Sequence, residues 1–400
     1  MVRILFINSV CGVGSTGRIC TDLYDLATEK GYSCYIAYGR DKAPKQYHTV
    51  KIGNQFDVIR HVLYTRLFDK HGFGSKRATI EFLKWVEEFK PDIIHLHNIH
   101  GYYLNIKLLF NYFIKNPQIK IIWTLHDCWA LTGHCAYFTH LNCSKWKTNC
   151  SKCIAKNDYP KSFYDNSVHN FKNKKALFNK LPNLTITTVS NWMNSVINES
   201  FLKDFPVITI KNGININNTQ WDSKIIKKYN YLLSYNKKII LGVANIWDNR
   251  KGLDDFKQLA KEISNDFIIV LVGLNKHQIE DMPKNIIGIK RTDNPRELYY
   301  LYFIATVFFN PTKEESFGLT NMEAQLVGTP VISYDSGGTS ETIINNNCFL
   351  IKNDISNVLP ILKENQLKKI NLAEIKLSLF DKNIYYKNYL KLYELLGGKK

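Results

Sequence analysis

A chain of 400 residues is longer than one hydrophobic core usually supports, so we expect two domains. Its hydrophobic content of 45% and charged content of 22% exclude a disordered chain, and no apolar stretch approaches the ~18–20 residues that a membrane span needs. The net charge of +18 is concentrated in residues 1–213, with 28 Lys and Arg against 15 Asp and Glu, and favours an anionic partner unless it reflects a Lys-rich background composition.

The sequence lacks the zinc-finger and basic-helix patterns of nucleic-acid-binding proteins, so no nucleic acid is expected as the partner. The N-terminal run MVRILFIN is too short for a secretion signal and is typical of a first β-strand. We therefore expect a cytoplasmic protein, and a membrane surface stays open as its anionic partner.

Short apolar strands alternate with helical stretches along the whole chain. Strands are predicted at residues 3–8, 33–39, 92–97, 120–126 and 184–190, and then at 238–245, 267–273, 285–291, 306–312 and 329–335. Strands rich in Ile, Val and Leu that are separated by helices, such as 75–89 and 102–115, predict parallel sheets covered on both faces.

This alternation predicts an α/β protein with two doubly wound, Rossmann-like domains facing a central cleft. Ligands of such folds bind at the carboxyl ends of the strands. The predicted domains are residues 1–213, which include a Cys-rich loop at 128–160, and residues 214–375. Residues 376–400 are predicted to form a C-terminal helix that packs back across the junction.

The first strand leads into a glycine-rich turn, GVGSTG at residues 12–17. Glycine lets the backbone approach a ligand and the following helix N-terminus attracts anions, so Gly12 and Gly14 are candidate ligand-binding residues. The turn also matches the G-x-G-x-x-G pattern of dinucleotide-binding proteins. The second strand, however, ends in Tyr38-Gly39-Arg40 rather than in the expected acidic residue, so hydride transfer is the least favoured hypothesis.

The first strand of the second half is followed by Arg250 and Lys251, just ahead of a predicted helix. Two cations at this position can neutralise a diphosphate. A solvated basic pair is the alternative, which the helix macrodipole mildly disfavours.

The stretch EESFGLTNMEA places Glu315 and Glu323 eight positions apart, with a helix predicted to begin near Phe317 and to reach about Val327. Glu323 could accept hydrogen bonds from vicinal ribose hydroxyls and Glu315 from sugar hydroxyls, although two solvated glutamates are the alternative. Backbone amides at the helix start predict an anion cradle. The candidate cradle residues are Ser316, Phe317, Gly318 and Leu319.

These motifs resemble glycosyltransferase family 4, a group of retaining enzymes with the two-domain GT-B fold. The hallmark E-x7-E followed by Ala is matched by Glu315, Glu323 and Ala324, and NGI near residue 212, Lys251-Gly252 and GG…E at 337–341 follow in order. The resemblance covers essentially the whole chain. This sequence departs from the family at Asn245 and Ile246, where the family usually has an arginine. Arg250 would have to take the role of that arginine.

The resemblance implies transfer of a hexose, with retention, from a UDP- or GDP-sugar to an oligosaccharide or lipid-linked glycan in surface polysaccharide biosynthesis, such as capsule or O-antigen. It assigns Glu323 to the ribose, Glu315 to the donor sugar, and Arg250 and Lys251 to the diphosphate. It also places His126, at the end of a strand, beside the donor sugar; a purely structural histidine is the alternative.

The family's front-face mechanism lets the leaving phosphate accept the acceptor's proton, and no catalytic metal is expected. A sugar-nucleotide epimerase or phosphorylase of the same architecture is the main alternative enzyme. A non-catalytic glycan-binding protein is the alternative outside catalysis.

Four cysteines of the loop at 128–160 are spaced C-x7-C-x6-C-x2-C; they are Cys135, Cys143, Cys150 and Cys153. The C-x2-C half-site with two further thiols favours a structural zinc site. Disulfides, free thiols and an iron–sulfur cluster are the alternatives. Similar loops occur in a subset of polysaccharide-building relatives of the family. The position of this loop just after His126 indicates that it shapes the acceptor side rather than performing chemistry.

Residues 56–68, FDVIRHVLYTRLF, place apolar side chains on one helical face with Arg60 and Arg66 nearby. Such a helix can lie on anionic lipid, or it can pack on its own sheet, which is the commoner case. Because the first half is basic, we hypothesise a peripheral enzyme on the inner face of the cytoplasmic membrane.

Overall fold

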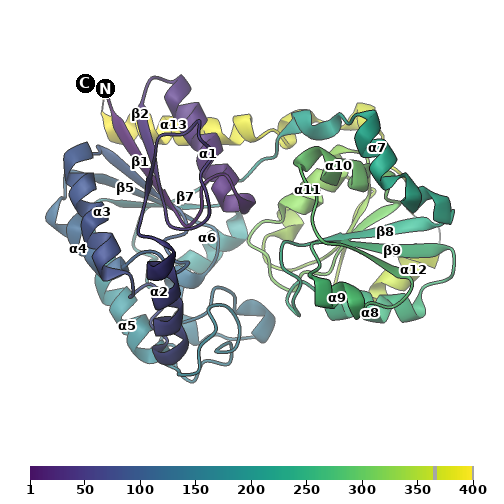
Figure 1. Cartoon of the computed structure of the whole chain (residues 1–400), viewed down its shortest axis with the longest axis horizontal. Coiled ribbons are helices and arrows are strands. Elements are labelled where there is room, and N and C mark those ends of the chain that lie inside the picture. Colours follow the sequence, from purple (N-terminus) through teal and green to yellow (C-terminus); the bar gives the residue numbers. More distant parts are fainter. Residues whose placement is uncertain (364–366, 399–400) are drawn as a thin grey trace. The chain divides into compact units, whose positions relative to one another are not determined.

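The computed structural model describes residues 1–363 and 367–398. The chain divides into two units, one made of residues 1–211 with the C-terminal stretch from Tyr386, and the other of Asn212–Tyr385 (Figure 1). Each unit contains a parallel β-sheet with helices on both faces. The predicted pair of Rossmann-like α/β domains is therefore confirmed.

The sheet of the first unit has seven strands among the described residues, in the order β3-β2-β1-β4-β5-β6-β7, and all neighbouring pairs are parallel. The strands are β1 (Arg3–Asn8), β2 (Ser33–Tyr38), β3 (Thr49–Lys51), β4 (Ile93–Leu96), β5 (Lys120–Leu125), β6 (Leu184–Thr188) and β7 (Val207–Thr209). The two outermost strands were not predicted, because three residues are too few to show a pattern.

The helices of the first unit cover both faces of this sheet. They are α1 (Gly14–Glu29), α2 (Gln55–Phe68), α3 (Lys76–Phe89), α4 (Ile106–Lys115), α5 (Ser167–Phe178), α6 (Asn191–Asn198) and the larger part of α13 (Lys382–Gly397). Side chains of β1 alternate between two cores, since Leu5 and Ile7 pack with α3 and α4 whereas the ring of Phe6 lies 6.2 Å from that of Tyr393 on α13.

Helix α13 is joined to the first sheet by buried hydrogen bonds as well as by apolar contacts. The hydroxyl of Tyr393 lies 2.7 Å from Nδ1 of His95, and that of Tyr389 lies 3.1 Å from Oγ1 of Thr124. Buried polar groups of this kind fix the register of the helix on the sheet, because a slip would leave each of them without a partner.

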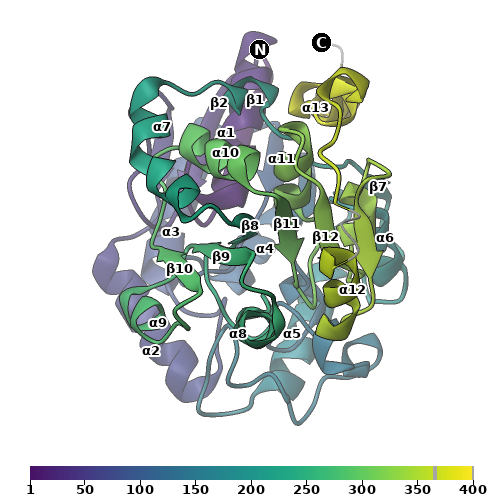
Figure 2. The same cartoon turned by 90° about the vertical axis from the view of Figure 1, so that its right-hand side faces the viewer.

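The sheet of the second unit has six parallel strands in the described part of the chain, in the order β10-β9-β8-β11-β12-β13 (Figure 2). They are β8 (Lys238–Val243), β9 (Phe267–Val272), β10 (Ile286–Ile289), β11 (Val307–Asn310), β12 (Val331–Tyr334) and β13 (Phe349–Ile351). The helices are α7 (Ser223–Tyr229), α8 (Leu253–Glu262), α9 (Lys276–Glu280), α10 (Pro295–Ile304), α11 (Leu319–Leu326) and α12 (Val358–Lys363).

Local sequence signals explain where many of these helices begin. The side chains of Asn105, Ser190 and Asp222 accept backbone N–H groups at the first turns of α4, α6 and α7, and Asn294 does the same for α10, where Pro295 follows as the first helical residue. Within the described residues, no helix is both long enough and apolar enough to cross a membrane.

Candidate active site

Three loops of the second unit converge around Glu315. The backbone oxygen of Glu315 accepts a hydrogen bond of 2.8 Å from the N–H of Gly338, and a Cβ on Gly337 would lie 2.1 Å from the same oxygen. The N–H of Lys313 donates to the backbone oxygen of Arg250 over 2.8 Å. These contacts join the loops that follow β8, β11 and β12, at the carboxyl edge where ligands of such sheets bind.

The side chains of Lys251 and Glu315 form an ion pair, with about a fifth of each side chain exposed. Burial opposes ionisation of Glu315, but the positive charges of Lys251 and Arg250 outweigh it and lower the pKa of Glu315. The guanidinium of Arg250 donates to the backbone oxygen of Glu314 over 2.9 Å. Three predicted residues, Glu315, Lys251 and Arg250, are thus brought together.

Helix α11 begins at Leu319, two residues later than predicted, because Gly318 takes a left-handed conformation with φ of 96° and caps it. The first amides of α11 follow directly on Ser316, Phe317 and Gly318, as the predicted anion cradle requires. The hydroxyl of Ser316 is buried and has no hydrogen-bond partner within residues 1–363 and 367–398. Buried hydroxyls are normally paired, so this one is available to a ligand.

Glu323 lies on α11, four residues after its start, so it stands little more than one turn into the helix rather than the two turns predicted. Its carboxylate accepts a hydrogen bond of 3.1 Å from the hydroxyl of Tyr302 on α10. This contact orients the carboxylate and leaves it partly exposed.

A buried polar network anchors α11, and none of its members was predicted. The amide of Asn310 donates to Asn321 over 2.8 Å, and that of Asn321 donates to the hydroxyl of Thr342 over 3.0 Å. Gln325 accepts from two backbone N–H groups, at residues 344 and 345, and donates to the backbone oxygen of Thr342. Asn and Gln inside a predicted apolar helix were the available signal, because such side chains are seldom buried without partners.

In the first unit, His126 follows β5 directly and is paired with a second histidine. Nε2 of His126 lies 2.9 Å from Nδ1 of His97, and the two rings are stacked. Burial lowers the pKa of His126 to about 4 and that of His97 well below its usual value, so both imidazoles are neutral near pH 7. Nε2 of His97 is buried without a hydrogen-bond partner among the described residues.

A second set of hydrogen-bonded side chains lies near the ends of the same two strands. Nε2 of His100 lies 2.8 Å from Asp127, and Nδ1 of His100 lies 3.0 Å from the hydroxyl of Tyr159. Burial alone would raise the pKa of Asp127. The charge and the hydrogen bond of His100 act in the opposite direction and outweigh burial, so the pKa of Asp127 is lowered. His97, His100, His126 and Asp127 line a small cavity. The motif HLHNIH at residues 95–100, which spans the end of β4, was the sequence signal for this cluster, since side chains at strand ends gather at one edge.

The glycine-rich turn lies between β1 and α1 in the first unit. Gly12 and Gly14 have φ of 71° and 66°, and the N–H of Gly12 donates to the backbone oxygen of Gly17 over 3.1 Å. A Cβ on Gly12 would lie 2.9 Å from Pro44, whereas Gly14 has nothing within 4 Å of that position. The turn leaves open space at Gly14, where a ligand can approach the backbone.

The predicted zinc site is not supported. Among the described residues no group of three or more His, Cys, Asp or Glu side chains is arranged to hold a metal ion. Instead Cys135 and Cys153 share a hydrogen bond that lowers the pKa of Cys153 to about 7, and all four cysteines are free thiols. Cys143 and Cys150 are partly buried against the hydrophobic core of the first unit.

Comparison with known proteins identifies the family. The protein-family model described as Glycosyltransferase Family 4 matches residues 16–218, just over half of the chain. The family model described as glycosyl transferases group 1 matches residues 225–360. The chain belongs to glycosyltransferase family 4. The resemblance drawn from the E-x7-E motif is thereby confirmed.

Among relatives of this glycosyltransferase chain is the putative colanic acid biosynthesis glycosyl transferase WcaC of Escherichia coli, which is 30% identical over 45% of this chain and 46% of WcaC. The match therefore spans less than half the length of that relative. Among solved structures, sucrose-phosphate synthase of Thermosynechococcus elongatus has a TM-score of 0.70 at 14% identity over 99% of both chains. HepE of Anabaena in complex with UDP and glucose has a TM-score of 0.66 at 15% identity over 99% of this chain and 100% of its own. These likenesses confirm the fold class.

Proposed function

We propose that this family-4 glycosyltransferase transfers a hexose, with retention of configuration, from a UDP- or GDP-sugar to a glycan of a surface polysaccharide. The observation that carries the proposal is the Lys251–Glu315 pair beside Arg250 and the start of α11. The site combines cations and backbone N–H groups suited to a diphosphate with carboxylates suited to sugar and ribose hydroxyls.

Each side chain takes a distinct role in this proposal. Lys251, Arg250 and the amides of α11 hold the diphosphate and stabilise the negative charge that develops on it as the bond to the sugar breaks. Glu323, oriented by Tyr302, accepts hydrogen bonds from the ribose. Glu315 accepts from hydroxyls of the donor sugar, and its lowered pKa keeps it an acceptor at neutral pH.

The proposed mechanism is front-face transfer. The acceptor hydroxyl attacks the anomeric carbon on the face that the leaving diphosphate occupies, and a phosphate oxygen takes the hydroxyl proton as the bond to the diphosphate breaks. The protein then supplies position and charge stabilisation. His126, which is neutral near pH 7, contributes a hydrogen bond to the donor sugar.

Two comparisons support the choice of substrates. HepE is described in complex with UDP and glucose, which favours UDP as the nucleotide. WcaC is described as a putative colanic acid biosynthesis glycosyl transferase, which favours a surface glycan as acceptor. We place the acceptor, a lipid-linked oligosaccharide at the cytoplasmic face of the membrane, beside the polar cavity of His100 and Asp127 in the first unit.

Transfer can be tested by incubating the purified protein with UDP-glucose, UDP-galactose and GDP-mannose, with and without lipid-linked oligosaccharides extracted from the source membranes. We expect acceptor-dependent release of one nucleoside diphosphate and, by NMR, a product anomer that matches the donor. Glu315→Gln should lower kcat by about 100-fold or more, as loss of one preorganised polar contact to the transition state does. Exposed Glu280→Gln on α9 is the matched control.

Three outcomes contradict the proposal. Conversion of the nucleotide sugar without an acceptor would identify an epimerase, and dependence of the reaction on inorganic phosphate would identify a phosphorylase. Binding of glycans without turnover of any donor would identify a non-catalytic glycan-binding protein.

A further inference from the structure

Helix α2 buries polar side chains and exposes most of its large apolar ones. Its two buried residues are polar, His61 and Thr65, whereas its apolar side chains face solvent. Phe56 is 74% exposed, and Leu63 and Leu67 are 54% and 53% exposed. The more common arrangement, in which the apolar face packs on the sheet, is therefore wrong for this helix.

The polar face of α2 is fully used inside the protein. Nε2 of His61 accepts the N–H groups of Gly72 and Gly74, at 3.1 and 3.2 Å, and its Nδ1 lies 2.9 Å from the hydroxyl of Ser75. Thr65 donates to the backbone oxygen of His61 over 2.9 Å. Rotation of the helix to bury its apolar side chains would break the hydrogen bonds of His61 to residues 72–75, whereas the bond of Thr65 lies within the helix.

Residues 162–164, which follow the Cys-rich loop, add a second apolar segment beside the end of α2. The N–H of Phe163 donates to the backbone oxygen of Arg66 over 2.8 Å, and the hydroxyl of Ser162 donates to the same oxygen over 3.1 Å. Phe163 and Tyr164 are 72% and 59% exposed. Their side chains thus extend the apolar stripe of α2.

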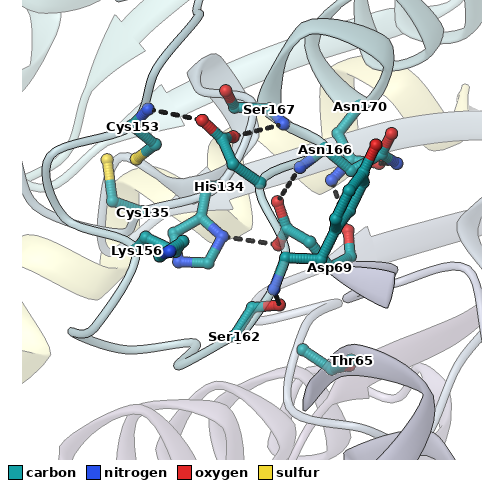
Figure 3. Close-up of polar contacts among 12 residues, drawn as sticks. Thr65, Asp69, His134, Cys135, Cys153, Lys156, Ser162, Asn166, Ser167 and Asn170 are labelled. Carbon is teal, nitrogen blue, oxygen red and sulfur yellow. Dashed lines mark hydrogen bonds and ion pairs between the residues drawn. The ribbon is translucent and has the colours of Figure 1, made fainter. Parts of the chain in front are cut away.

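A buried hydrogen-bond network joins the end of α2 to the Cys-rich loop and to the segment that follows it (Figure 3). The carboxylate of Asp69, which caps α2, lies 2.5 Å from Nδ1 of His134 and accepts the N–H of Asn166 over 2.9 Å. Asn170 donates to the backbone oxygen of Asp69 over 2.5 Å. The side chains of Asp69 and His134 are 1% and 0% exposed, so helix and loop form one rigid surface.

The charge around this surface is positive. Residues 56–70 and 154–164 contain five cations, Arg60, Arg66, Lys70, Lys156 and Lys161, and three acids. Of the acids, Asp57 is held in the capping box of α2 and Asp69 is buried, which leaves Asp158 as the freely exposed carboxylate of the two segments. Exposed apolar side chains in segments with an excess of cations complement an anionic lipid surface.

We propose that Phe56, Ile59, Leu63, Leu67, Phe163 and Tyr164 form a docking surface that inserts into an anionic membrane. The excess of cations in the same two segments favours an anionic lipid surface over a protein partner, because the buried cores of protein interfaces are depleted of charged residues. The inference deepens the proposed function and rests on it, because a membrane-bound enzyme meets a lipid-linked acceptor at the surface where that acceptor lies.

The test is flotation of the full chain with vesicles of phosphatidylcholine alone or with added phosphatidylglycerol, at low and high salt. We expect flotation with the anionic vesicles that weakens as salt is raised. Leu63→Ser with Phe163→Ser should weaken binding by about tenfold or more, since two apolar side chains leave the interface. Ile80→Ser is the matched control, because Ile80 on α3 of the same unit is 46% exposed and should leave binding unchanged.

Two results would overturn the proposal. One is wild-type protein that stays with the vesicle-free fraction at low salt, and the other is a double variant that floats like the wild type. If the wild type instead forms a dimer in solution that the double variant does not, the surface binds a second copy and not lipid. Stabilisation by UDP is measured on every variant, so a failed donor site is distinguished from a failed docking surface.

Discussion

The strongest test of the site is replacement of Lys251 by Met, which keeps much of the aliphatic stem and removes the charge. Glu315 then stays ionised in a setting where about a fifth of its side chain is exposed, with Arg250 as its nearest other cation. Exposed pairs contribute about 0–1 kcal/mol, whereas breaking a fully buried pair costs about 3–5 kcal/mol. We therefore expect the second unit to lose about 2 kcal/mol.

The assay is urea unfolding of the wild type, Lys251→Met, Glu315→Gln and the double variant. A neutral amide needs no cation, so the double variant should recover most of the stability that Lys251→Met loses. The double-mutant cycle then gives the coupling free energy of the pair directly. A coupling below about 0.3 kcal/mol, with the two single losses simply additive, would refute the ion pair as described.

The ion pair of Lys251 and Glu315 also predicts how the free energy of unfolding depends on pH. The folded-state pKa of Glu315 is lowered from its ordinary value of 4.5, so its contribution to stability is fully present above pH 4.5 and is lost as the pH falls through the folded-state pKa. The stability difference between the wild type and Lys251→Met should therefore shrink below about pH 4.5. A difference that grows on acidification would contradict the assigned direction.

Three further predictions address other parts of the two units. UDP at 100 times its dissociation constant should stabilise the wild type by about 2.7 kcal/mol, and Glu323→Ala should reduce this to about 1 kcal/mol or less in thermal shift, because charged hydrogen bonds are lost. Gly337→Ala should destabilise the second unit by more than about 2 kcal/mol in urea, since its Cβ would meet the backbone oxygen of Glu315 at 2.1 Å. His97→Phe should lower kcat about tenfold, with unfolding unchanged within about 1 kcal/mol, because the ring of His126 loses its partner at 2.9 Å.

Much of the fold could be predicted because its strands are long and continuously apolar. All ten predicted strands are present, with ends that differ by at most two residues. Lys251 and Glu315 could be identified as candidates because each lies in the loop that follows a strand, and Glu323 because its spacing from Glu315 is local. The start of α11 was predicted two residues early because the backbone of Gly318, and not a side-chain cap, sets it.

What could not be predicted depends on contacts between distant parts of the chain. The pairing of His97 with His126 joins residues 29 apart, and that of Asp69 with His134 joins residues 65 apart. The sequence left open whether the apolar side chains of α2 are exposed or packed, because periodicity does not show which face of a helix the rest of the protein covers. The cysteine spacing likewise indicated a metal where the structure has hydrogen-bonded and packed thiols.

The two units divide the electrostatic work of the proposed transfer. A departing diphosphate requires positive charge, and the imidazoles of His97 and His126 are kept neutral by burial, so they cannot supply it near pH 7. The proposed mechanism therefore assigns that stabilisation to Lys251 and Arg250, and assigns to His126 a hydrogen bond rather than a charge. It follows that lowering the pH from 8 to 6 should leave any contribution of His126 to kcat unchanged, because its pKa of about 4 lies well below this range.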